Sequence, residues 1–273
     1  MKIATTQIKE DWHDRRLWID PPRGWRGRTA RWLLGCLESR IAAWSIHGDR
    51  PVYDRETFDW IDAAEARWEW VREEVSVVLE NRESVPRFQD VFAGFVGIQN
   101  DDDWRTHFLI AMGRAVEPNA GRCPETMRLI HEIPGVRNAF FSILAPHKHI
   151  PPHRGPYNGL LRFHLALVVP EPRERCRIRI ANEVHSWTEG DALVFDDTFR
   201  HAVWNDTDGI RVVLFIDFER PLRAPYHWLN ARILDVISRA PPLTRARRRL
   251  ERRERCHAQG GSPVVRSERG VQR

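Results

Sequence analysis

The sequence predicts a mainly β protein with flanking helices, of the sandwich or jelly-roll type. Between residues 139 and 218, short runs rich in Val, Ile, Phe and Leu are separated by Pro, Gly, Asn and Asp, which is typical of strands joined by turns. Strands at this regular spacing favour a sandwich or jelly roll over alternating strands and helices. The expected strands are residues 139–144, 161–169, 176–181, 192–195, 201–204 and 210–218.

Helices are expected on both sides of this region. Apolar residues step by three and four from Phe58 to Val78, so residues 56–81 are predicted to form a helix that covers one side of a sheet. A short helix is expected at residues 123–130, and a last one at residues 229–238, before two consecutive prolines.

We expect one folded domain, residues 51–240, between two basic ends. Residues 1–50 form a basic segment with one amphipathic helix within residues 32–44, where apolar side chains recur at three- and four-residue steps. Packing of this helix on the domain is one interpretation, and its lying on a membrane surface is the other.

The C-terminal segment, residues 241–273, carries the basic charge of the chain. It holds ten arginines against three glutamates, a net charge of +7, whereas the whole chain carries +5. Residues 245–255 are predicted to be an arginine-rich helical run, but the segment as a whole is expected to be solvated and partly disordered. Contact with an anionic membrane is an alternative, while the absence of aromatic residues argues against nucleic acid.

Composition also limits the cellular setting. The longest apolar runs fall far short of the roughly 18 residues that a membrane span needs, and no signal peptide is recognisable. We therefore expect a cytoplasmic protein, with peripheral membrane contact through the basic ends as an alternative. The four scattered cysteines predict free thiols instead of a disulfide framework or a zinc knuckle.

Polar residues interrupt the expected strands in a suggestive pattern. A period of two places Arg162 and His164 on one strand face and their apolar neighbours on the other, so packing of the apolar face against helices would direct both into the barrel. Arg211 likewise shares a face with Val213 and Phe215. A lone buried cation is costly unless an anion meets it, and pairing with a nearby aspartate is the alternative explanation.

Together these residues indicate an iron site. Imidazole suits Fe(II), and non-haem iron oxygenases leave coordination positions open for a 2-oxo acid and dioxygen. His153 and His201 are candidate ligands, and Arg211, on a strand neighbouring that of His201, is the candidate partner for the distal carboxylate of the 2-oxo acid. Each residue alone could be an ordinary core or surface residue, but the combination favours a metal site.

The motifs resemble those of the aspartyl/asparaginyl β-hydroxylase family. The resemblance is carried by His-Ile-Pro-Pro-His-Arg-Gly-Pro at 149–156, Leu-Arg-Phe-His-Leu at 161–165, and the run from Gly190 to Asn205, followed by Arg211. It is dense over about residues 104–221 and absent from both basic ends. It implies a double-stranded β-helix (jelly-roll/cupin-like) core and an enzyme that depends on Fe(II), 2-oxoglutarate and O2.

The resemblance also implies residue roles. His153 and His201 would ligate iron, Arg211 would bind the distal carboxylate of 2-oxoglutarate, and Ser142, Arg162 and His164 would support that cosubstrate. Most 2-oxoglutarate oxygenases have an acid two places after the first histidine. Gly155 stands there instead, as in this family, so water is expected at the third iron position. Asp196 and Asp197 could substitute, although hydrogen bonding of the turn or of a ligand is the preferred role for them.

The implied reaction is hydroxylation of an unactivated C–H bond with release of succinate and CO2. The favoured substrate is the β-carbon of an aspartyl or asparaginyl residue, in a peptide, a carrier-bound amino acid or a free one. A fatty-acyl hydroxylase, similar to the lipid A branch of the family, is the alternative. Arg154, Asn158, His149 and Arg200 lie close to the iron motifs and are candidates for holding a substrate anion. From another class, a non-catalytic barrel that binds an organic acid stays open, although the intact histidines and Arg211 favour an enzyme.

Overall fold

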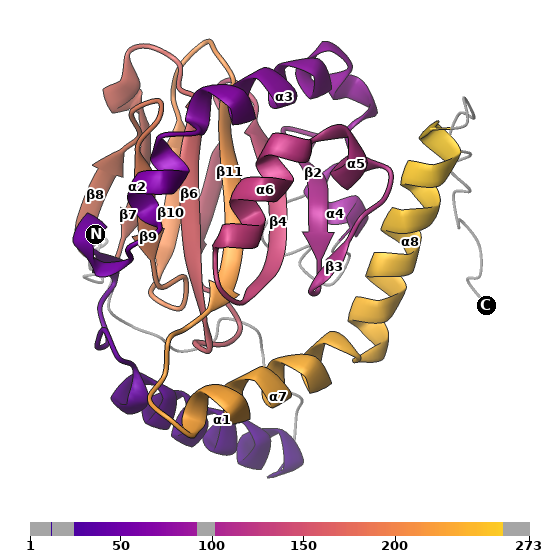
Figure 1. Ribbon diagram of the computed structural model, residues 1–273. Coiled ribbons are helices and arrows are strands. Elements are labelled where there is room, and N and C mark those ends of the chain that lie inside the picture. Colours follow the sequence, from indigo (N-terminus) through magenta and orange to yellow (C-terminus); the bar gives the residue numbers. More distant parts are fainter. Residues whose placement is uncertain (1–11, 13–24, 92–101, 259–273) are drawn as a thin grey trace, which may run out of the picture.

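Two antiparallel sheets face each other in the computed structural model, which describes residue 12 and residues 25–91 and 102–258 (Figure 1). The larger sheet has the order β1 (Val52–Tyr53), β9 (Ala192–Phe195), β6 (Leu160–Val168), β11 (Arg211–Glu219), β4 (Val136–Leu144), β2 (Trp104–Ala111) and β3 (Arg114–Ala115). The smaller sheet has the order β5 (His149–His153), β10 (His201–Asn205), β7 (Cys176–Ile180) and β8 (Glu183–Ser186). All six predicted strands are present, and the fold is the predicted jelly roll with flanking helices.

Helices cover the outer face of the larger sheet. They are α2 (Ile61–Glu65), α3 (Trp68–Glu80) and α6 (Pro124–Glu132), with α5 (Asn119–Arg122) beside them (Figure 1). Leu161, Phe163 and Leu165 of β6 are fully buried beneath them, as strand alternation predicted. The opposite, inner face of the larger sheet contributes Val213 and Phe215 of β11 to a second apolar cluster between the two sheets. Arg162 and His164, which alternate with the helix-facing residues, therefore belong to the inner face.

The predicted single helix at residues 56–81 is wrong. The structure has three pieces there, η1 (Arg55–Thr57), α2 and α3, with a break at Ala66 and Arg67. The Glu65 carboxylate accepts a hydrogen bond from the Ala192 backbone N–H at 2.8 Å, which ties α2 to β9. The chain then turns so that Val71 and Val75 of α3 pack into the same core over β6. A straight helix would not follow the twisted sheet in this way.

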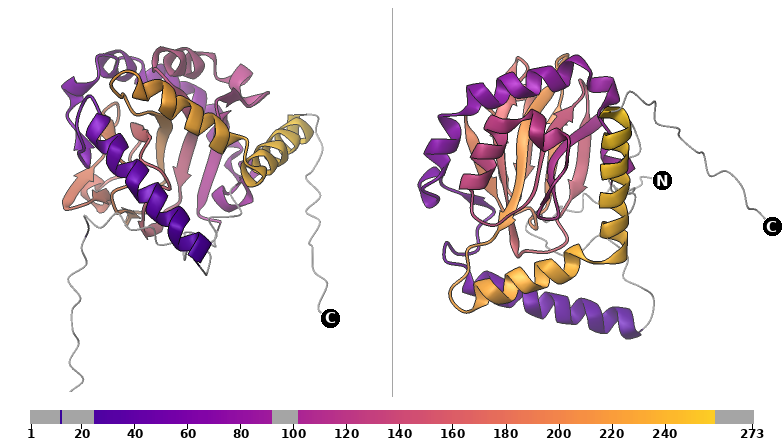
Figure 2. Two further views of the ribbon diagram at one scale, coloured as in Figure 1. Left: turned by 90° about the horizontal axis from the view of Figure 1, so that it is seen from below. Right: turned by 45° about the vertical axis from the view of Figure 1, so that its right-hand side comes forward.

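The N-terminal helix packs on the domain, as one of the two interpretations predicted, and the C-terminal segment is packed more extensively than predicted. α1 (Trp25–Trp44) lies beside α7 (Tyr226–Ser238), and Trp44 stacks on Tyr226 with ring centroids 3.6 Å apart (Figures 1 and 2). α8 (Pro241–Ala258) continues the fold beyond residue 240, and its Leu250 is buried in the inter-sheet cluster beside α4 (Phe88–Val91). Helix 229–238 is therefore not the last one. The predicted helical run at residues 245–255 is confirmed within α8, but this helix packs on the fold instead of being solvated on all sides. Residues 259–273 lie outside the described part.

The remaining short helical turns are η2 (Arg82–Ser84) and η4 (Arg173–Arg175). All four cysteines carry free thiols, as predicted, with Cys123 and Cys176 buried. Within the described residues, no helix combines the length and the apolar character that a membrane span requires.

Candidate active site

A histidine pair lies between β5 and β10. The strand register sets His153 directly opposite His201, and their ring centroids are 4.1 Å apart. His153 Nδ1 is 2.8 Å from the carbonyl oxygen of Pro151, and His201 Nδ1 is 2.9 Å from that of Phe199. Because a carbonyl oxygen only accepts, each Nδ1 carries the proton and donates it. Each Nε2 therefore keeps its lone pair, as metal-ligating histidines do.

The surroundings keep both rings neutral. Burial lowers the pKa of His153 to about 4, and burial with the neighbouring His153 lowers the pKa of His201 well below its ordinary value. A neutral imidazole is the form that binds a metal. In the part of the chain that the structure describes, no group of three or more His, Cys, Asp and Glu side chains is arranged to hold a metal ion. The centre here thus offers two histidines.

A carboxylate occupies the space beside Gly155. The Gly155 backbone N–H donates to the Asp197 carbonyl oxygen at 2.7 Å, which brings the loop after β5 against the loop before β10. A Cβ on residue 155 would stand 2.1 Å from Asp197 Oδ2, far inside van der Waals contact. Residue 155 therefore has no room for any side chain, acidic or not, because the Asp197 carboxylate occupies that space.

Asp197 is held by Arg162. Arg162 Nη2 lies 2.7 Å from Asp197 Oδ2, and its Nε donates to Asp217 Oδ1 at 3.0 Å. Burial raises the pKa of the Asp197 carboxyl to about 6, while the Arg162 guanidinium acts in the opposite direction. Arg162 also lies over the Phe215 ring, 4.2 Å from its centroid. The described partners of Arg162 are thus carboxylates of the protein.

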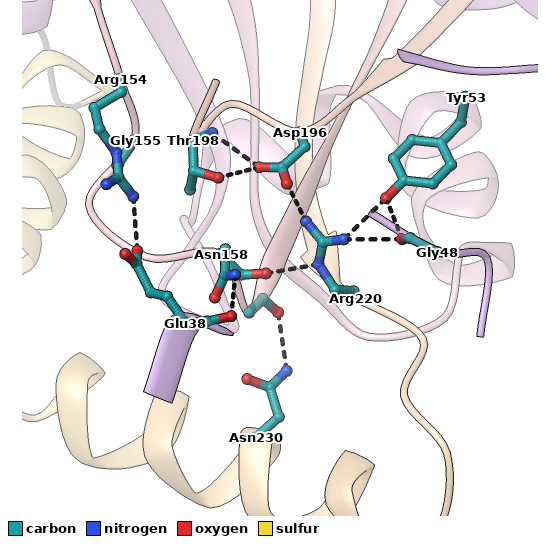
Figure 3. Close-up of polar contacts among 11 residues, drawn as sticks. Glu38, Gly48, Tyr53, Arg154, Gly155, Asn158, Asp196, Thr198, Arg220 and Asn230 are labelled. Atoms are coloured by element: carbon teal, nitrogen blue, oxygen red, sulfur yellow. Dashed lines mark hydrogen bonds and ion pairs between the residues drawn. The ribbon is translucent and has the colours of Figure 1, made fainter. Parts of the chain in front are cut away.

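Asp196 serves a separate network, drawn in Figure 3. Its carboxylate forms a buried ion pair with Arg220 and accepts hydrogen bonds from the backbone and hydroxyl of Thr198. Arg220 Nε also donates to the Asn158 carbonyl oxygen at 2.7 Å. The two neighbouring aspartates therefore face different partners, and the prediction that they hydrogen-bond the turn holds for Asp196.

Arg211 is a buried cation with unpaired donors. Its side chain is 2% exposed, and among the residues that the structure describes its Nε and Nη1 have no hydrogen-bond partner. Burial lowers the pKa of Arg211 to about 10. The alternative pairing with Asp206 or Asp208 is wrong, because these bind Arg177 and His147 instead.

The sequence predicted that Arg211 and His201 lie on neighbouring strands, and this prediction is wrong. β11 belongs to the larger sheet and β10 to the smaller one, so the two residues come from opposite walls of the sandwich. A line of rings connects them. The Phe195 ring centroid is 5.7 Å from His201 and 5.1 Å from His164, and the His164 ring is 6.1 Å from Trp187, over which Arg211 lies at 4.9 Å.

Further unpaired polar atoms lie along this line of rings between His201 and Arg211. Within the described parts of the chain, both ring nitrogens of His164 and Trp187 Nε1 are buried without a hydrogen-bond partner. Burial, followed by Arg211 and Arg162, lowers the pKa of His164 well below its ordinary value. We assigned no role to Trp187 from the sequence, because its place beside Arg211 depends on a tertiary contact.

Ser142 also lies in this interior. It is 2% exposed, pairs with Val213 of β11, and its Oγ accepts a hydrogen bond from Trp104 Nε1 at 3.0 Å. Two residues along β4, Leu144 is the register partner of Arg211. The structure thus brings all six predicted site residues to the β-sandwich, with the histidine pair on β5 and β10 of the smaller sheet and Ser142, Arg162, His164 and Arg211 on strands of the larger sheet.

The predicted substrate-anion residues have structural partners. Arg154 Nη2 donates to Glu38 of α1 at 2.6 Å, and Asn158 Nδ2 donates to the Glu38 carbonyl oxygen at 2.8 Å (Figure 3). His149 stacks on Trp204 with centroids 4.9 Å apart, and Arg200 lies over the ring of Trp12 at 4.9 Å. Arg154 and Asn158 therefore connect the loop after His153 to the first helix.

Residues 65–221, more than half of the chain, match the model of a family described as aspartyl/asparaginyl beta-hydroxylase. The chain is 44% identical over 209 residues to an ornithine lipid ester-linked acyl 2-hydroxylase of Rhizobium tropici, which covers 77% of this chain and 74% of that protein. It is 34% identical over 170 residues to the human aspartyl/asparaginyl beta-hydroxylase, covering 60% of this chain but only 22% of the human protein. Among solved structures, a prolyl-4-hydroxylase of Pseudomonas putida is similar over 56% of this chain and 87% of that chain, with 15% identity and a TM-score of 0.36.

Proposed function

The chain belongs to the aspartyl/asparaginyl β-hydroxylase family, and from this premise we propose that it is an Fe(II)- and 2-oxoglutarate-dependent hydroxylase of an ester-linked acyl chain in an ornithine-type lipid. The family and the relatives support a hydroxylase. The iron, the cosubstrate and the lipid are our proposal.

The chemistry of the donor set supports the iron. Two neutral imidazoles lie next to each other, and each donates its Nδ1 hydrogen to a backbone carbonyl, which leaves each Nε2 lone pair available to a metal. His153 and His201 would hold the metal. A bound ferrous ion would supply the activation of dioxygen that this protein's own side chains cannot supply.

Arg211 is the observation that carries the cosubstrate assignment. Burying a guanidinium whose Nε and Nη1 lack acceptors destabilises the folded protein. A carboxylate would offset this cost, because its two oxygens can accept hydrogen bonds from both nitrogens. His164 and Trp187 Nε1 offer further hydrogen bonds along the line that leads from the histidines to Arg211. These groups would bind and orientate a dicarboxylic acid between the histidine pair and Arg211.

Two other residues would shape the region around the metal. The Asp197 carboxylate, held by Arg162, stands beside Gly155 and can accept a hydrogen bond from a water molecule at the open position. The apolar residues of the inter-sheet cluster exclude bulk water from the rest of the interior.

The comparisons favour the lipid alternative over the aspartyl or asparaginyl side chain that we put first from the sequence. The similarity to the ornithine lipid hydroxylase is higher and extends over three quarters of that protein, whereas the human enzyme is matched over 22% of its length. An aspartyl or asparaginyl substrate remains the second candidate because the matched family carries that name.

The iron assignment is tested by spectroscopy under anaerobic conditions. Addition of Fe(II) and 2-oxoglutarate together to the wild-type protein should produce a weak visible absorption band, and His201→Ala should lose it. His147→Ala, which changes an exposed histidine away from the pair, should retain it. A band of equal strength in His201→Ala would exclude this iron site.

The substrate is tested by mass spectrometry of aerobic reactions. With ornithine lipid we expect a gain of one oxygen atom on the ester-linked acyl chain, together with one succinate. Oxygen gained instead by peptides that contain Asp or Asn would support the second candidate and exclude the first.

A further inference from the structure

Helices α1 and α7 form a layer at one end of the β-sandwich (Figures 1 and 2). Their inner faces meet in one apolar cluster, to which α1 contributes Ile41 and α7 contributes Leu234, packed with Tyr157 and Leu222. Because both helices bury the faces that point to this cluster, their opposite faces point to solvent.

The solvent face of α7 alternates apolar side chains with arginines. Leu229, Arg232, Val236 and Arg239 follow one another at steps of three, four and three residues, which places them on one helix face, with Trp228 beside them. Trp228 is 59% exposed and Val236 is 68% exposed. A solvent-facing helix surface is normally polar, so these exposed apolar residues call for an explanation.

The charge of this face is positive. The single acid of α7, Asp235, forms an ion pair with Arg137 at 2.7 Å. Arg232 and Arg239 are exposed, and Arg232 lies over the Trp228 ring, 5.1 Å from its centroid. On the solvent face of the neighbouring α1, Trp32 is 67% exposed and Arg40 is exposed as well.

We propose that this α1–α7 face, defined by Trp32, Trp228, Leu229, Arg232, Val236 and Arg239, docks on an anionic phospholipid membrane. The proposal rests on the proposed lipid substrate, which resides in a membrane. Tryptophan, leucine and valine side chains enter the boundary between headgroups and acyl chains, while arginines bind the lipid phosphates. This combination of charge and exposed apolar surface favours an anionic bilayer over an uncharged protein partner.

The docking face is connected to the histidine pair. Residues 154–159, which follow His153, lie against both helices through four hydrogen bonds, and Figure 3 draws the two that Arg154 and Asn158 donate to Glu38 of α1. Arg154 donates to Glu38 of α1, the Tyr157 hydroxyl donates to Asn230 Oδ1 of α7 at 2.9 Å, and Asn230 Nδ2 donates to the Gly159 carbonyl oxygen at 2.9 Å. Docking through α1 and α7 therefore brings the loop beside the metal ligand to the membrane, where an acyl chain near its ester bond would be presented.

Vesicle sedimentation with the full-length chain tests the surface directly, without iron or cosubstrate. The wild-type protein should bind vesicles that contain phosphatidylglycerol and bind pure phosphatidylcholine vesicles much more weakly. The triple variant Trp228→Ser/Leu229→Ser/Val236→Ser should lower the affinity for the anionic vesicles by about tenfold or more. Arg232→Ser/Arg239→Ser should lower it by about twentyfold, because each arginine near an anionic surface contributes about a fivefold effect.

Matched controls change exposed residues elsewhere. Trp70→Ser/Val77→Ser/Val184→Ser removes comparably exposed apolar side chains from α3 and β8, and Arg128→Ser/Arg173→Ser removes exposed arginines from α6 and η4. Both controls should bind as the wild type does. Equal losses in the controls and the α7 variants would overturn the proposal, as would a wild-type dimer that the α7 triple variant converts to a monomer.

A second measurement separates this proposal from the proposed function. With ornithine lipid dispersed in detergent, the α7 triple variant should retain wild-type turnover, while turnover of the same lipid in anionic vesicles should fall by about tenfold. Normal vesicle binding without hydroxylation of either preparation would refute only the substrate. Turnover in detergent without selective vesicle binding would refute only the docking face.

Discussion

At the residue scale, Arg211 is the feature that sequence alone could only suggest. Strand alternation predicted that it faces inward with Val213 and Phe215, and the structure confirms this. The sequence could not establish that no described residue supplies an anion to the side chain, because Asp206 and Asp208 come shortly before Arg211 in the chain. Only the tertiary structure shows that those aspartates are bound by other residues.

The unpaired state of Arg211 predicts opposite effects with and without ligand. Arg211→Met removes a desolvated charge, so the ligand-free variant should be as stable as the wild type or more stable. The wild type should gain thermal stability with 2-oxoglutarate, and the variant should lose most of this gain, because a charge-assisted contact contributes about 1.5–3 kcal/mol. Differential scanning fluorimetry measures both effects. Arg177→Met, which changes a partly exposed arginine, should keep the ligand response, and an unchanged response in Arg211→Met would contradict the assignment.

His107 predicts a pH dependence of stability away from the site. It lies on β2, its Nε2 is buried with no hydrogen-bond partner among the described residues, and burial lowers its pKa to about 4. The unfolded chain binds this proton near pH 6.5 and the folded chain does not, so stability falls as the pH drops from about 6.5 to about 4. Between pH 7 and pH 5 the loss is about 2 kcal/mol. His107→Phe should reduce the acid-induced loss by that amount in urea unfolding, and an identical loss in both proteins would show that His107 is accessible to protons.

At the element scale, strands were predictable and helix breaks were not. The two-residue period of β6 reflects an apolar face beneath the helices that alternates with the inner-face residues Arg162 and His164, and this alternation can be read from the local sequence. The apolar three- and four-residue steps continue through Ala66 and Arg67, so nothing local signals the break between α2 and α3. β5 was not predicted, because Pro151 and Pro152 are unusual in strands, and they are tolerated since β5 is an edge strand.

The loops before β10 and after β5 are predicted to be energetically coupled. Gly155→Ala would place a methyl group 2.1 Å from Asp197 Oδ2, which should cost about 1–3 kcal/mol of stability through overpacking. In the background Asp197→Gly that space is empty, and the same alanine should cost much less. A double-mutant cycle by chemical unfolding measures the coupling. Equal costs of Gly155→Ala in both backgrounds would show that the two loops separate readily.

At the scale of the whole molecule, the candidate active site and the helical layer of α1 and α7 are connected by hydrogen bonds. α1 holds the loop after His153 through Glu38, and α7 holds it through Asn230. The sequence placed the ends of the chain outside the domain because they are basic, and charge alone does not distinguish a solvated segment from a helix with one apolar stripe. Leu250, the buried residue in the middle of an arginine-rich run, is the signal that α8 packs.

α8 is therefore predicted to stabilise the whole fold. Leu250 is 2% exposed in the inter-sheet cluster near α4, and Arg253 lies 3.3 Å from Asp90 of that helix. Leu250→Ala should lower the free energy of unfolding by about 2–4 kcal/mol, as expected for a buried leucine. Arg249→Ala, one residue earlier on the exposed side of the same helix, should change it by no more than about 0.5 kcal/mol. Because α8 packs on α4 and α7, neither of which carries a residue of the histidine pair, Leu250→Ala should still form the Fe(II)–2-oxoglutarate absorption band at low temperature. Equal stability of the two variants would mean that α8 is dispensable to the fold.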